Sequence, residues 1–432
     1  MAIHLKIITF STETRKKQEN QSTFVLLGNP LEKVDMNILA IDDQKLVLIP
    51  LANKLKEMGY DVITETNGLK GIELYDSIQP DLVIVDINMP IISGLEVIKH
   101  IRASKKPNTP IMILSGNTDD AMLTQGFDSG ADDYMKKPLG LTEVGLRVKK
   151  LIGAPANNKI ETKYSNTIIQ KRCVGVVIPC YNEGKRLRGK KFTDYIDKNS
   201  GYHLCFVNDG STDKTLKILN KLRKGRENFI TVYNCEKNYG KAEAVRQGML
   251  YMAQQEDLDY IGFLDADLST NLSDFDDLVS TIEGSRYKIV SGCRINRMGA
   301  NIRKESVRKV VSLILNFIIT RILKMDFKDT QCGAKVFHKD IVHIAFDKTF
   351  ISKWIFDVEI YRRITLSFGL KKARRIVCEQ PLKRWIHAEG SKLSMKDSLK
   401  IFLQLGQVAW FYRARKQKNF KYLVDKQRNI FS

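Results

Sequence analysis

The sequence predicts an α/β protein of two domains, and three observations lead to this fold class. Its 432 residues exceed what one ordinary hydrophobic core organises. From Met36 onward, short apolar runs alternate with amphipathic helical stretches, which is the pattern of a largely parallel sheet covered by helices. This alternation stops over the polar residues 154–172 and then resumes from Val174 to about residue 390.

The first alternation repeats strand and helix five times and predicts a parallel, doubly wound domain over residues 36–153. Its apolar runs are Ile38–Ile41, Val62–Thr64, Leu82–Val85, Ile111–Leu114 and a short fifth run before Lys137. Helical stretches lie near 44–58, 68–77, 92–103, 118–129 and 141–151. We expect 1–35 to be an extension without a clear fold, 154–172 a linker, 173–393 the second domain, and 394–432 a basic amphipathic segment.

Cysteine usage and hydropathy favour a cytoplasmic protein. The seven cysteines form no C-x-x-C pair, which argues against a disulfide framework or a zinc site. Lys6 interrupts any signal-like apolar run, and the most apolar window, Val310–Thr320, is shorter than the ~20 residues that cross a bilayer.

Charge is unevenly distributed along the chain. The net charge is +21, yet residues 36–153 hold thirteen Lys and Arg against sixteen Asp and Glu, whereas the chain from Lys371 onward holds sixteen against four. Such a basic end suits an anionic membrane surface, a phosphorylated substrate or nucleic acid, and an ordinary solvated face is the alternative.

Polar side chains follow the strands of the first domain where each strand ends. Asp42 and Asp43 follow the first, Asp86 the third, Ser115 the fourth and Lys137 the fifth. In an open parallel sheet these ends meet at one edge, and three crowded carboxylates need a divalent cation to offset their repulsion. We therefore predict a Mg2+ site, with Ser115 and Lys137 holding the oxygens of a phosphoryl group on Asp86.

This domain resembles the receiver domain of two-component response regulators. The resemblance rests on Asp42-Asp43, D-I-N-M-P at 86–90, L-S-G at 114–116 and Lys137-Pro138. It implies a flavodoxin-like (βα)5 fold with Asp86 as phosphoacceptor, Asp42 and Asp43 as Mg2+ ligands, and Ser115 and Tyr134 as switch residues. It also implies a sensor histidine kinase or a phosphotransfer protein as partner.

The second domain places polar motifs after its own strands. The strand Val174–Pro179 leads into C-Y-N-E at 180–183, and Leu204–Val207 leads into N-D-G-S-T-D at 208–213. Gly210 permits a tight turn, and Asp209 suits the base or ribose edge of a nucleotide.

A third strand, Ile261–Leu264, ends in Asp265-Ala266-Asp267. In extended backbone, residues i and i+2 point the same way, so both carboxylates face one point. A Mg2+ or Mn2+ ion there could bridge to a diphosphate and neutralise the charge of a leaving nucleoside diphosphate.

Residues 172–393 resemble family 2 glycosyltransferases of the GT-A (Rossmann-like) fold. Further motifs are N-Y-G-K-A at 238–242, D-T-Q-C-G-A-K at 329–335, W-I-F-D-V-E at 354–359 and G-S-K-L at 390–393. This set is similar to the polyprenyl-phosphate branch, above all the dolichyl-phosphate glucosyltransferases, with the mannosyltransferases beside them. The resemblance implies nucleotide-sugar contacts from Pro179, Tyr181, Glu183, Asp209, Lys241 and Lys392, metal ligation by Asp265 and Asp267, and acceptor-phosphate contacts from Arg294 and Lys335.

A phosphate acceptor is already ionised near pH 7, so the reaction needs charge neutralisation more than a general base. If a base exists, Asp357 and Glu359 are the candidates, and the alternative is that these carboxylates hold a loop. Two segments depart from the family pattern: G-K-A-E-A at 240–244 and G-C-R at 292–294.

Two apolar stretches, Val307–Leu323 and Ile401–Tyr412, carry adjacent cations and aromatic residues. Such helices can lie in a membrane interface at the inner face of the cell membrane, and the alternative is packing onto the enzyme's own core or a homodimer partner.

We therefore expect an inverting transfer of a hexose, with UDP-glucose the favoured donor, to a polyprenyl phosphate, regulated by phosphorylation of Asp86. Alternatives are a saccharide or protein hydroxyl acceptor, and a non-catalytic regulator that senses nucleotide sugars. A DNA-binding regulator is disfavoured because the transferase pattern leaves no room for a helix-turn-helix, so no nucleic-acid partner is expected.

Overall fold

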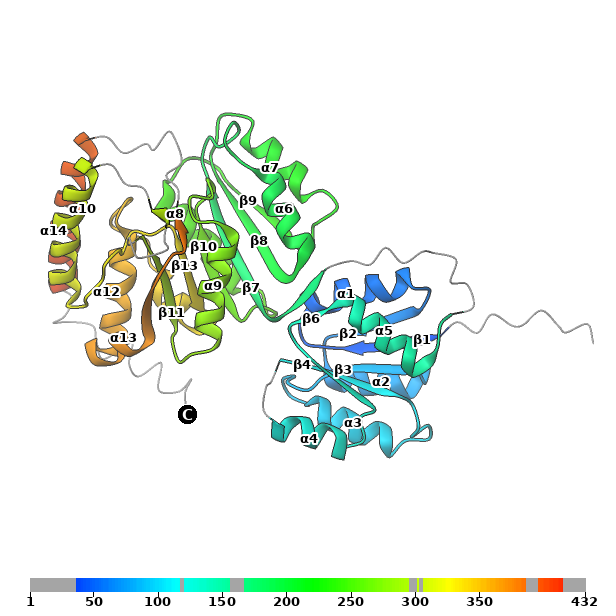
Figure 1. Cartoon of the computed structure of the whole chain (residues 1–432). Helices are drawn as coiled ribbons and strands as arrows, with labels where there is room; N and C mark the ends of the chain where they lie inside the picture. Colours follow the sequence, from blue (N-terminus) through cyan, green and yellow to red (C-terminus); the bar gives the residue numbers. More distant parts are fainter. Residues whose placement is uncertain are drawn as a thin grey trace, which may run out of the picture.

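The computed structural model describes residues 36–116, 120–155, 167–294, 301–302, 306–385 and 395–414. The first domain is a five-stranded parallel sheet in the order β2-β1-β3-β4-β5, with helices on both faces (Figure 1). Its strands are β1 (Asn37–Ile41), β2 (Asp61–Glu65), β3 (Leu82–Asp86), β4 (Ile111–Ser115) and β5 (Asp133–Lys136). Its helices are α1 (Lys45–Glu57), α2 (Gly68–Ile78), α3 (Gly94–Arg102), α4 (Asp120–Asp128) and α5 (Leu141–Ile152).

The burial of each strand explains the pattern of apolar residues from which it was predicted. Every residue of β3 and β4 is buried, since helices cover both faces of these inner strands, and both read as continuous apolar runs. The edge strand β2 buries little beyond Val62. Each helix begins and ends within two residues of its predicted bounds, and the flavodoxin-like prediction is confirmed.

The second domain is a mixed sheet in the order β14-β11-β13-β10-β7-β8-β9, in which β13 runs antiparallel to β10 and β11. Its strands are β7 (Ile168–Cys180), β8 (Asn199–Asp209), β9 (Ile230–Cys235), β10 (Tyr260–Leu264), β11 (Ile289–Cys293), β13 (Ala334–His338) and β14 (Val377–Pro381), and β12 (Asn301–Ile302) pairs with β15 (Arg384–Trp385) apart from it. The helices are α6 (Gly189–Lys198), α7 (Thr215–Arg223), α8 (Lys241–Ala253), α9 (Leu272–Glu283), α10 (Ser306–Leu323), α11 (Val342–Phe346), α12 (Phe356–Phe368), α13 (Leu370–Ile376) and α14 (Met395–Ala414), with a 3-10 turn at Lys339–Ile341.

The segment expected as a linker, 154–172, differs in its last five residues, which already belong to β7. A two-residue strand of the first domain, β6 (Leu139–Gly140), pairs antiparallel with them, Leu139 opposite Ile169. Ile169 is fully buried, so a stretch without visible core spacing contributes to the core through this distant partner. The expected extension 1–35 lies outside the described residues, as do 156–166 of the linker.

Helices α10 and α14 lie side by side at one end of the second domain (Figure 1). Tyr412 of α14 donates from its hydroxyl to Glu359 at 3.1 Å and accepts from Arg363 Nε at 3.0 Å, and Ser352 Oγ donates to Gln404 at 2.6 Å. Part of the expected carboxy-terminal segment 394–432 is therefore joined to the domain core. None of the helices in the described part of the chain is long and apolar enough to cross a membrane.

Candidate functional site

The structure brings the acid residues of the first domain together with Lys137. Asp42, Asp86 and Lys137 are each at most 5% exposed. The Lys137 ammonium lies 2.6 Å from Asp42 Oδ2 and 3.3 Å from Asp86 Oδ1. The remaining carboxylate oxygens accept backbone N–H groups, from Gln44 to Asp42 at 3.0 Å and from Asn88 to Asp86 at 2.9 Å. One lysine thus balances part of a buried negative cluster.

Ser115 is also fully buried next to these groups. We call the set of Asp42, Asp43, Asp86, Ser115 and Lys137 the acid pocket. The backbone carbonyl of Ser115 accepts from Lys137 N at 2.8 Å, and its hydroxyl lies 3.5 Å from Asn88 Nδ2. Tyr134 lies on β5, half-buried, in register with Ile113 of β4.

Electrostatics in the acid pocket favours a cation. Burial, with Asp86 adding to it, raises the pKa of Asp42 to about 6 even though Lys137 opposes the shift. Burial and the charges of Asp42 and Asp86 raise the pKa of Asp43 to about 7. Burial alone would lower the pKa of Lys137, but its ion pairs raise it. An all-oxygen donor set with unbalanced negative charge fits Mg2+.

Gly94 is a residue that the sequence did not single out and that this pocket requires. A Cβ at this position would lie 2.2 Å from the Asp86 carbonyl oxygen, so only glycine lets α3 begin so close to the end of β3.

In the second domain, the loops after β7 and β8 are tied together by hydrogen bonds. Asn182, in the left-handed region at φ 52°, accepts from Thr212 N at 2.9 Å, and its own N–H donates to Ser211 Oγ at 3.0 Å. Glu183 N donates to Thr215 Oγ1 at 2.8 Å. These bonds join the loops that carry the C-Y-N-E and D-G-S-T-D motifs, and we call the joined loops the rim.

The predicted nucleotide residues differ in how accessible they are on this rim. Tyr181 is 36% exposed, and Pro179 at the end of β7 is half-buried. Glu183 is buried and accepts two bonds from Arg186, at 2.6 and 3.0 Å.

Asp209 has a structural task that its sequence position does not reveal. Its carboxylate is 2% exposed and accepts the backbone N–H groups of Tyr239 at 2.8 Å and Gly240 at 3.0 Å. Gly210, at φ 60°, has no space for a Cβ, which would lie 2.4 Å from Asn238 N. Together these two residues fix the N-Y-G turn that precedes α8.

The paired carboxylates stand where β10 ends. Asp265 and Asp267 are both partly exposed, and Ala266 between them is buried. These residues form a turn and not the extended stretch that the sequence predicted, since Leu268 N donates to the Asp265 carbonyl at 3.2 Å and Ser269 N donates to Asp267 Oδ1 at 2.9 Å. Lys241, at the start of α8, places its ammonium 2.5 Å from Asp265 Oδ1. Burial alone would lower the pKa of Lys241, but Asp265, with Asp357 and Asp267, raises it. In this site, as in the acid pocket, a lysine forms an ion pair within a group of carboxylates.

Gly333, unremarked within the D-T-Q-C-G-A-K motif, is required at this point. Its carbonyl accepts from Asp265 N at 3.1 Å, and a Cβ on it would lie 1.9 Å from Asp265 Oδ2. The backbone of 333 therefore forms one wall against which the carboxylate rests.

Lys335 is fully buried and is bound to Asp357 Oδ1 at 2.6 Å and to the Cys332 carbonyl at 2.7 Å. Burial raises the pKa of Asp357, while Lys335 and Lys241 oppose the shift. Glu359, fully buried, accepts from the backbone N–H groups of Ile351 and Ser352. These contacts support the alternative interpretation of Asp357 and Glu359, in which the two carboxylates stabilise the local structure and do not act as a base.

Arg294 is oriented by a chain of carboxylates. It donates to Asp329 from Nε at 2.6 Å and from Nη2 at 2.8 Å, and these ion pairs raise its pKa although burial opposes the rise. Glu379 in turn accepts the N–H groups of Lys328 and Asp329. Asp329 and Glu379 were not predicted as site residues, because their partners are distant in sequence.

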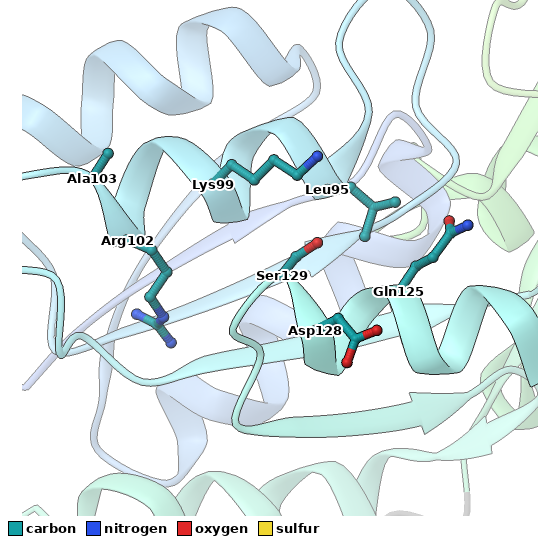
Figure 2. Close-up of a pocket in the computed structure, with 7 residues that line it drawn as sticks. All are labelled: Leu95, Lys99, Arg102, Ala103, Gln125, Asp128 and Ser129. Carbon is teal, nitrogen blue, oxygen red and sulfur yellow. The ribbon is translucent and has the colours of Figure 1, made fainter.

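Lys392 lies outside the described residues. Among the residues that the structure describes, no three His, Cys, Asp or Glu side chains are already arranged around one point as a metal site. The residues present nevertheless suit a divalent metal ion, because both sites offer carboxylate oxygens as ligands. In the structure these oxygens contact a lysine ammonium, Lys137 or Lys241, which is a monovalent cation. A hollow of about 530 Å3 between α3 and α4 is lined by none of the predicted residues; those lining it are Leu95, Lys99, Arg102, Ala103, Gln125, Asp128 and Ser129 (Figure 2).

Comparison with known families identifies both domains. Residues 38–149 match the response regulator receiver domain, and residues 175–344 match glycosyl transferase family 2. The chain therefore joins a receiver domain to a family 2 glycosyltransferase, as its motifs predicted.

Individual relatives follow the same division. A dolichyl-phosphate beta-glucosyltransferase of Trichomonas vaginalis is 29% identical over 60% of this chain and 80% of that protein, and one of Dictyostelium discoideum is 27% identical over 51% and 68%. The transcriptional regulatory protein PhoP of Bacillus subtilis is 34% identical over 28% of this chain and 49% of that protein. The solved chemotaxis response regulator CheY4 of Vibrio cholerae is 27% identical, covering 27% of this chain and 98% of its own, with a TM-score of 0.26.

We predict that Gly333→Ala lowers the glycosyl transfer rate by roughly 100-fold, because the new methyl group displaces the Asp265 carboxylate and small displacements at a reacting centre are costly. Gly406→Ala is the matched control, since a Cβ there meets nothing within 4 Å. Transfer rates and thermal melting of both variants are the measurement. An unchanged rate in Gly333→Ala would contradict the close packing described for this wall.

Proposed function

We propose that the protein transfers a hexose from a nucleotide-diphosphate sugar, UDP-glucose being the favoured donor, to a polyprenyl phosphate with inversion at the anomeric carbon. The observation that carries the proposal is the pair Asp265 and Asp267, both partly exposed at the end of β10 beside Lys241. The named relatives that are dolichyl-phosphate beta-glucosyltransferases support the choice of donor sugar and acceptor.

A Mg2+ or Mn2+ ion bound by Asp265 and Asp267 would neutralise the diphosphate of the donor. With such an ion bound to these carboxylates, the Lys241 ammonium that now pairs with Asp265 would be available as a second cation for the diphosphate. Tyr181 and Pro179 are accessible on the rim, and we assign them to the nucleotide base. An oxygen of the acceptor phosphate bonds to the anomeric carbon as the bond to the diphosphate breaks, and the nucleoside diphosphate leaves.

Arg294 is the residue we assign to the acceptor phosphate, since Asp329 fixes its guanidinium and 23% of its side chain is exposed. Lys335 acts beneath the site, where its fully buried ammonium neutralises Asp357. A phosphate acceptor enters already ionised, so the proposed transfer needs no general base.

A hollow of about 450 Å3 next to Arg294 and Asp329 supports a lipid phosphate as acceptor. It combines apolar side chains, which suit a hydrocarbon chain, with two cations, Lys328 and Arg374, whose charge is balanced by Asp326 and Glu379, so we assign the phosphate head to the neighbouring Arg294. Its lining residues are Cys293, Met325, Asp326, Phe327, Lys328, Arg374, Val377, Glu379 and Pro381.

The receiver domain, in this proposal, accepts a phosphoryl group on Asp86 from a sensor histidine kinase or phosphotransfer protein, with Mg2+ held by Asp42, Asp43 and Asp86. Ser115 and Lys137 would hold the phosphoryl oxygens and Tyr134 would reorient with Ser115. Transfer then depends on the phosphorylation state of the same chain.

We expect radiolabel from UDP-glucose or GDP-mannose to enter the organic phase when the protein is incubated with Mg2+ and polyprenyl phosphate. Asp265→Ala should reduce this transfer by about 100- to 1,000-fold, since it removes charge stabilisation at the leaving group. Asp340→Asn, at an aspartate paired with Lys288 outside the site, is the control. Label only in water-soluble product would favour a hydroxyl acceptor, and no transfer from any sugar nucleotide would refute the proposal.

We also propose peripheral contact with the inner face of the cytoplasmic membrane through α10 and α14. Among the side chains of these helices that the structure describes, three large apolar ones are exposed, Phe317 at 63%, Leu403 at 66% and Trp410 at 74%, and Arg321 lies 5.3 Å from the Phe317 ring. Apolar side chains with neighbouring cations suit a bilayer interface with anionic lipids.

Trp410→Glu should therefore weaken binding to vesicles that contain anionic phospholipid by about tenfold, because it replaces an exposed aromatic side chain, which would enter the lipid interface, with a negative charge that the anionic lipid repels. Ile91→Glu is the matched control, since Ile91 of the receiver is also highly exposed, at 87%. Co-sedimentation measures both. Equal binding by the two variants would show that this face does not contact the membrane.

A further inference from the structure

The receiver contacts the transferase domain with the loops at the carboxyl ends of the receiver strands, where the acid pocket also lies. Gln44, two residues beyond Asp42, donates from Nε2 to Asp259 Oδ2 at 2.7 Å. The Leu46 carbonyl accepts from Ser200 Oγ at 2.8 Å. The loop after β4 is equally close, because a Cβ on Gly116 would lie 2.9 Å from the Lys171 side chain.

A fourth contact follows directly from Lys137. Two residues further along, β6 pairs with the first residues of β7, Leu139 opposite Ile169 and Gly140 opposite Ile168 (Figure 1). Leu141 N then donates to the Thr167 carbonyl at 3.0 Å. The receiver thus adds a short strand to the transferase sheet, and this strand is continuous with the lysine of the acid pocket.

The groups that close the acid pocket are therefore connected to the groups that hold the domains together. Asp42 accepts from Gln44 N with one oxygen and from Lys137 with the other. A divalent cation on Asp42 competes with both of these bonds, and a phosphoryl group on Asp86 attracts the Lys137 ammonium away from Asp42. Either change displaces backbone that leads into the interface, at Gln44 or at β6.

The contact also has an apolar part. Leu46, Leu139 and Leu141 of the receiver are at most 4% exposed, and they share one hydrophobic cluster with Ile169 and Cys173 of β7. Separating the domains would expose this surface to water, so loosening of the polar contacts is easier than full dissociation.

The receiver is docked away from the transfer site. Asp259 immediately precedes β10 and also accepts Cys173 N at 2.9 Å, whereas Asp265 and Asp267 follow the other end of the same strand. The receiver therefore does not cover the catalytic carboxylates, and its influence reaches them through the strands β7 and β10.

We propose that binding of a divalent cation and a phosphoryl group in the acid pocket loosens the contact between the receiver and the transferase sheet, at the Gln44–Asp259 bond and the β6–β7 pairing. This inference rests on the receiver part of the proposed function, namely that Asp86 accepts a phosphoryl group. By thermodynamic reciprocity, weakening the contact strengthens ligand binding in the acid pocket.

The test is hydrogen exchange by mass spectrometry on the full chain, alone and with Mg2+ plus beryllofluoride, a mimic of the phosphoryl group. We expect the loop after β3 to gain protection and the amides of residues 139–141, 168–169 and 173 to exchange several-fold faster. Unchanged or slower exchange at the interface, with protection in the loop, would overturn this inference alone. If beryllofluoride does not bind, the receiver part of the proposed function fails as well.

Variants test the reciprocal effect. Gln44→Ala and Ser200→Ala each remove one hydrogen bond across the interface, and each should tighten Mg2+–beryllofluoride binding, measured by calorimetry, by roughly 2- to 10-fold. Ser200 is remote in sequence from the metal ligands, so its effect cannot arise from direct disturbance of Asp42. Gln247→Ala, which removes a side-chain bond wholly within the transferase domain, is the control. Equal affinities in wild type and both interface variants would overturn the proposal.

Discussion

The architecture of this protein depends on crowding negative charge at the carboxyl ends of parallel strands. Two carboxylates, at 42 and 86, share Lys137 in the receiver, and Asp265 of the carboxylate pair in the transferase binds Lys241. Such clusters are costly unless a cation compensates them, and a lysine does so without filling the coordination that a divalent ion prefers. In both sites a lysine therefore offsets part of the negative charge, and the proposed function requires that a metal and a phosphorylated ligand take over this role.

The receiver and the candidate transfer site lie at opposite ends of the strands of the transferase sheet. The amino-terminal ends of β7 and β10 face the receiver, through residues 168–173 and Asp259, and the carboxyl ends carry the motifs that we propose for the sugar donor. The receiver, attached in this way, does not cover the strand ends that carry Asp265 and Asp267. Its contacts described above are with β7, β8 and Asp259 before β10, so the proposed regulation would act through the position and stability of these strands.

Much of the fold was predictable from the sequence, because periodicity is a local property. The five receiver helices follow from the period of 3.6 residues. The period of 2 residues did not predict the turn that holds Asp265 and Asp267, because that turn depends on the bond from Leu268 N to the Asp265 carbonyl. The partners of the site residues were not predictable, since they depend on contacts distant in sequence: Asp209 with the amides of 239 and 240, Lys335 with Asp357, and Gly333 against Asp265. Ile169 looked like linker for the same reason, as its strand partner Leu139 belongs to the other domain.

In the proposed function, Asp265 and Asp267 bind one cation on the diphosphate of a sugar donor. A crystal structure of the protein with Mn2+ and UDP-glucose, in which anomalous scattering locates the metal, would test this directly. We predict a manganese peak within coordination distance of Asp265, Asp267 and the diphosphate, with the Lys241 ammonium moved from Asp265 to a phosphate oxygen. A nucleotide bound elsewhere, or bound here with no metal and with the Lys241–Asp265 pair intact, would contradict the claim.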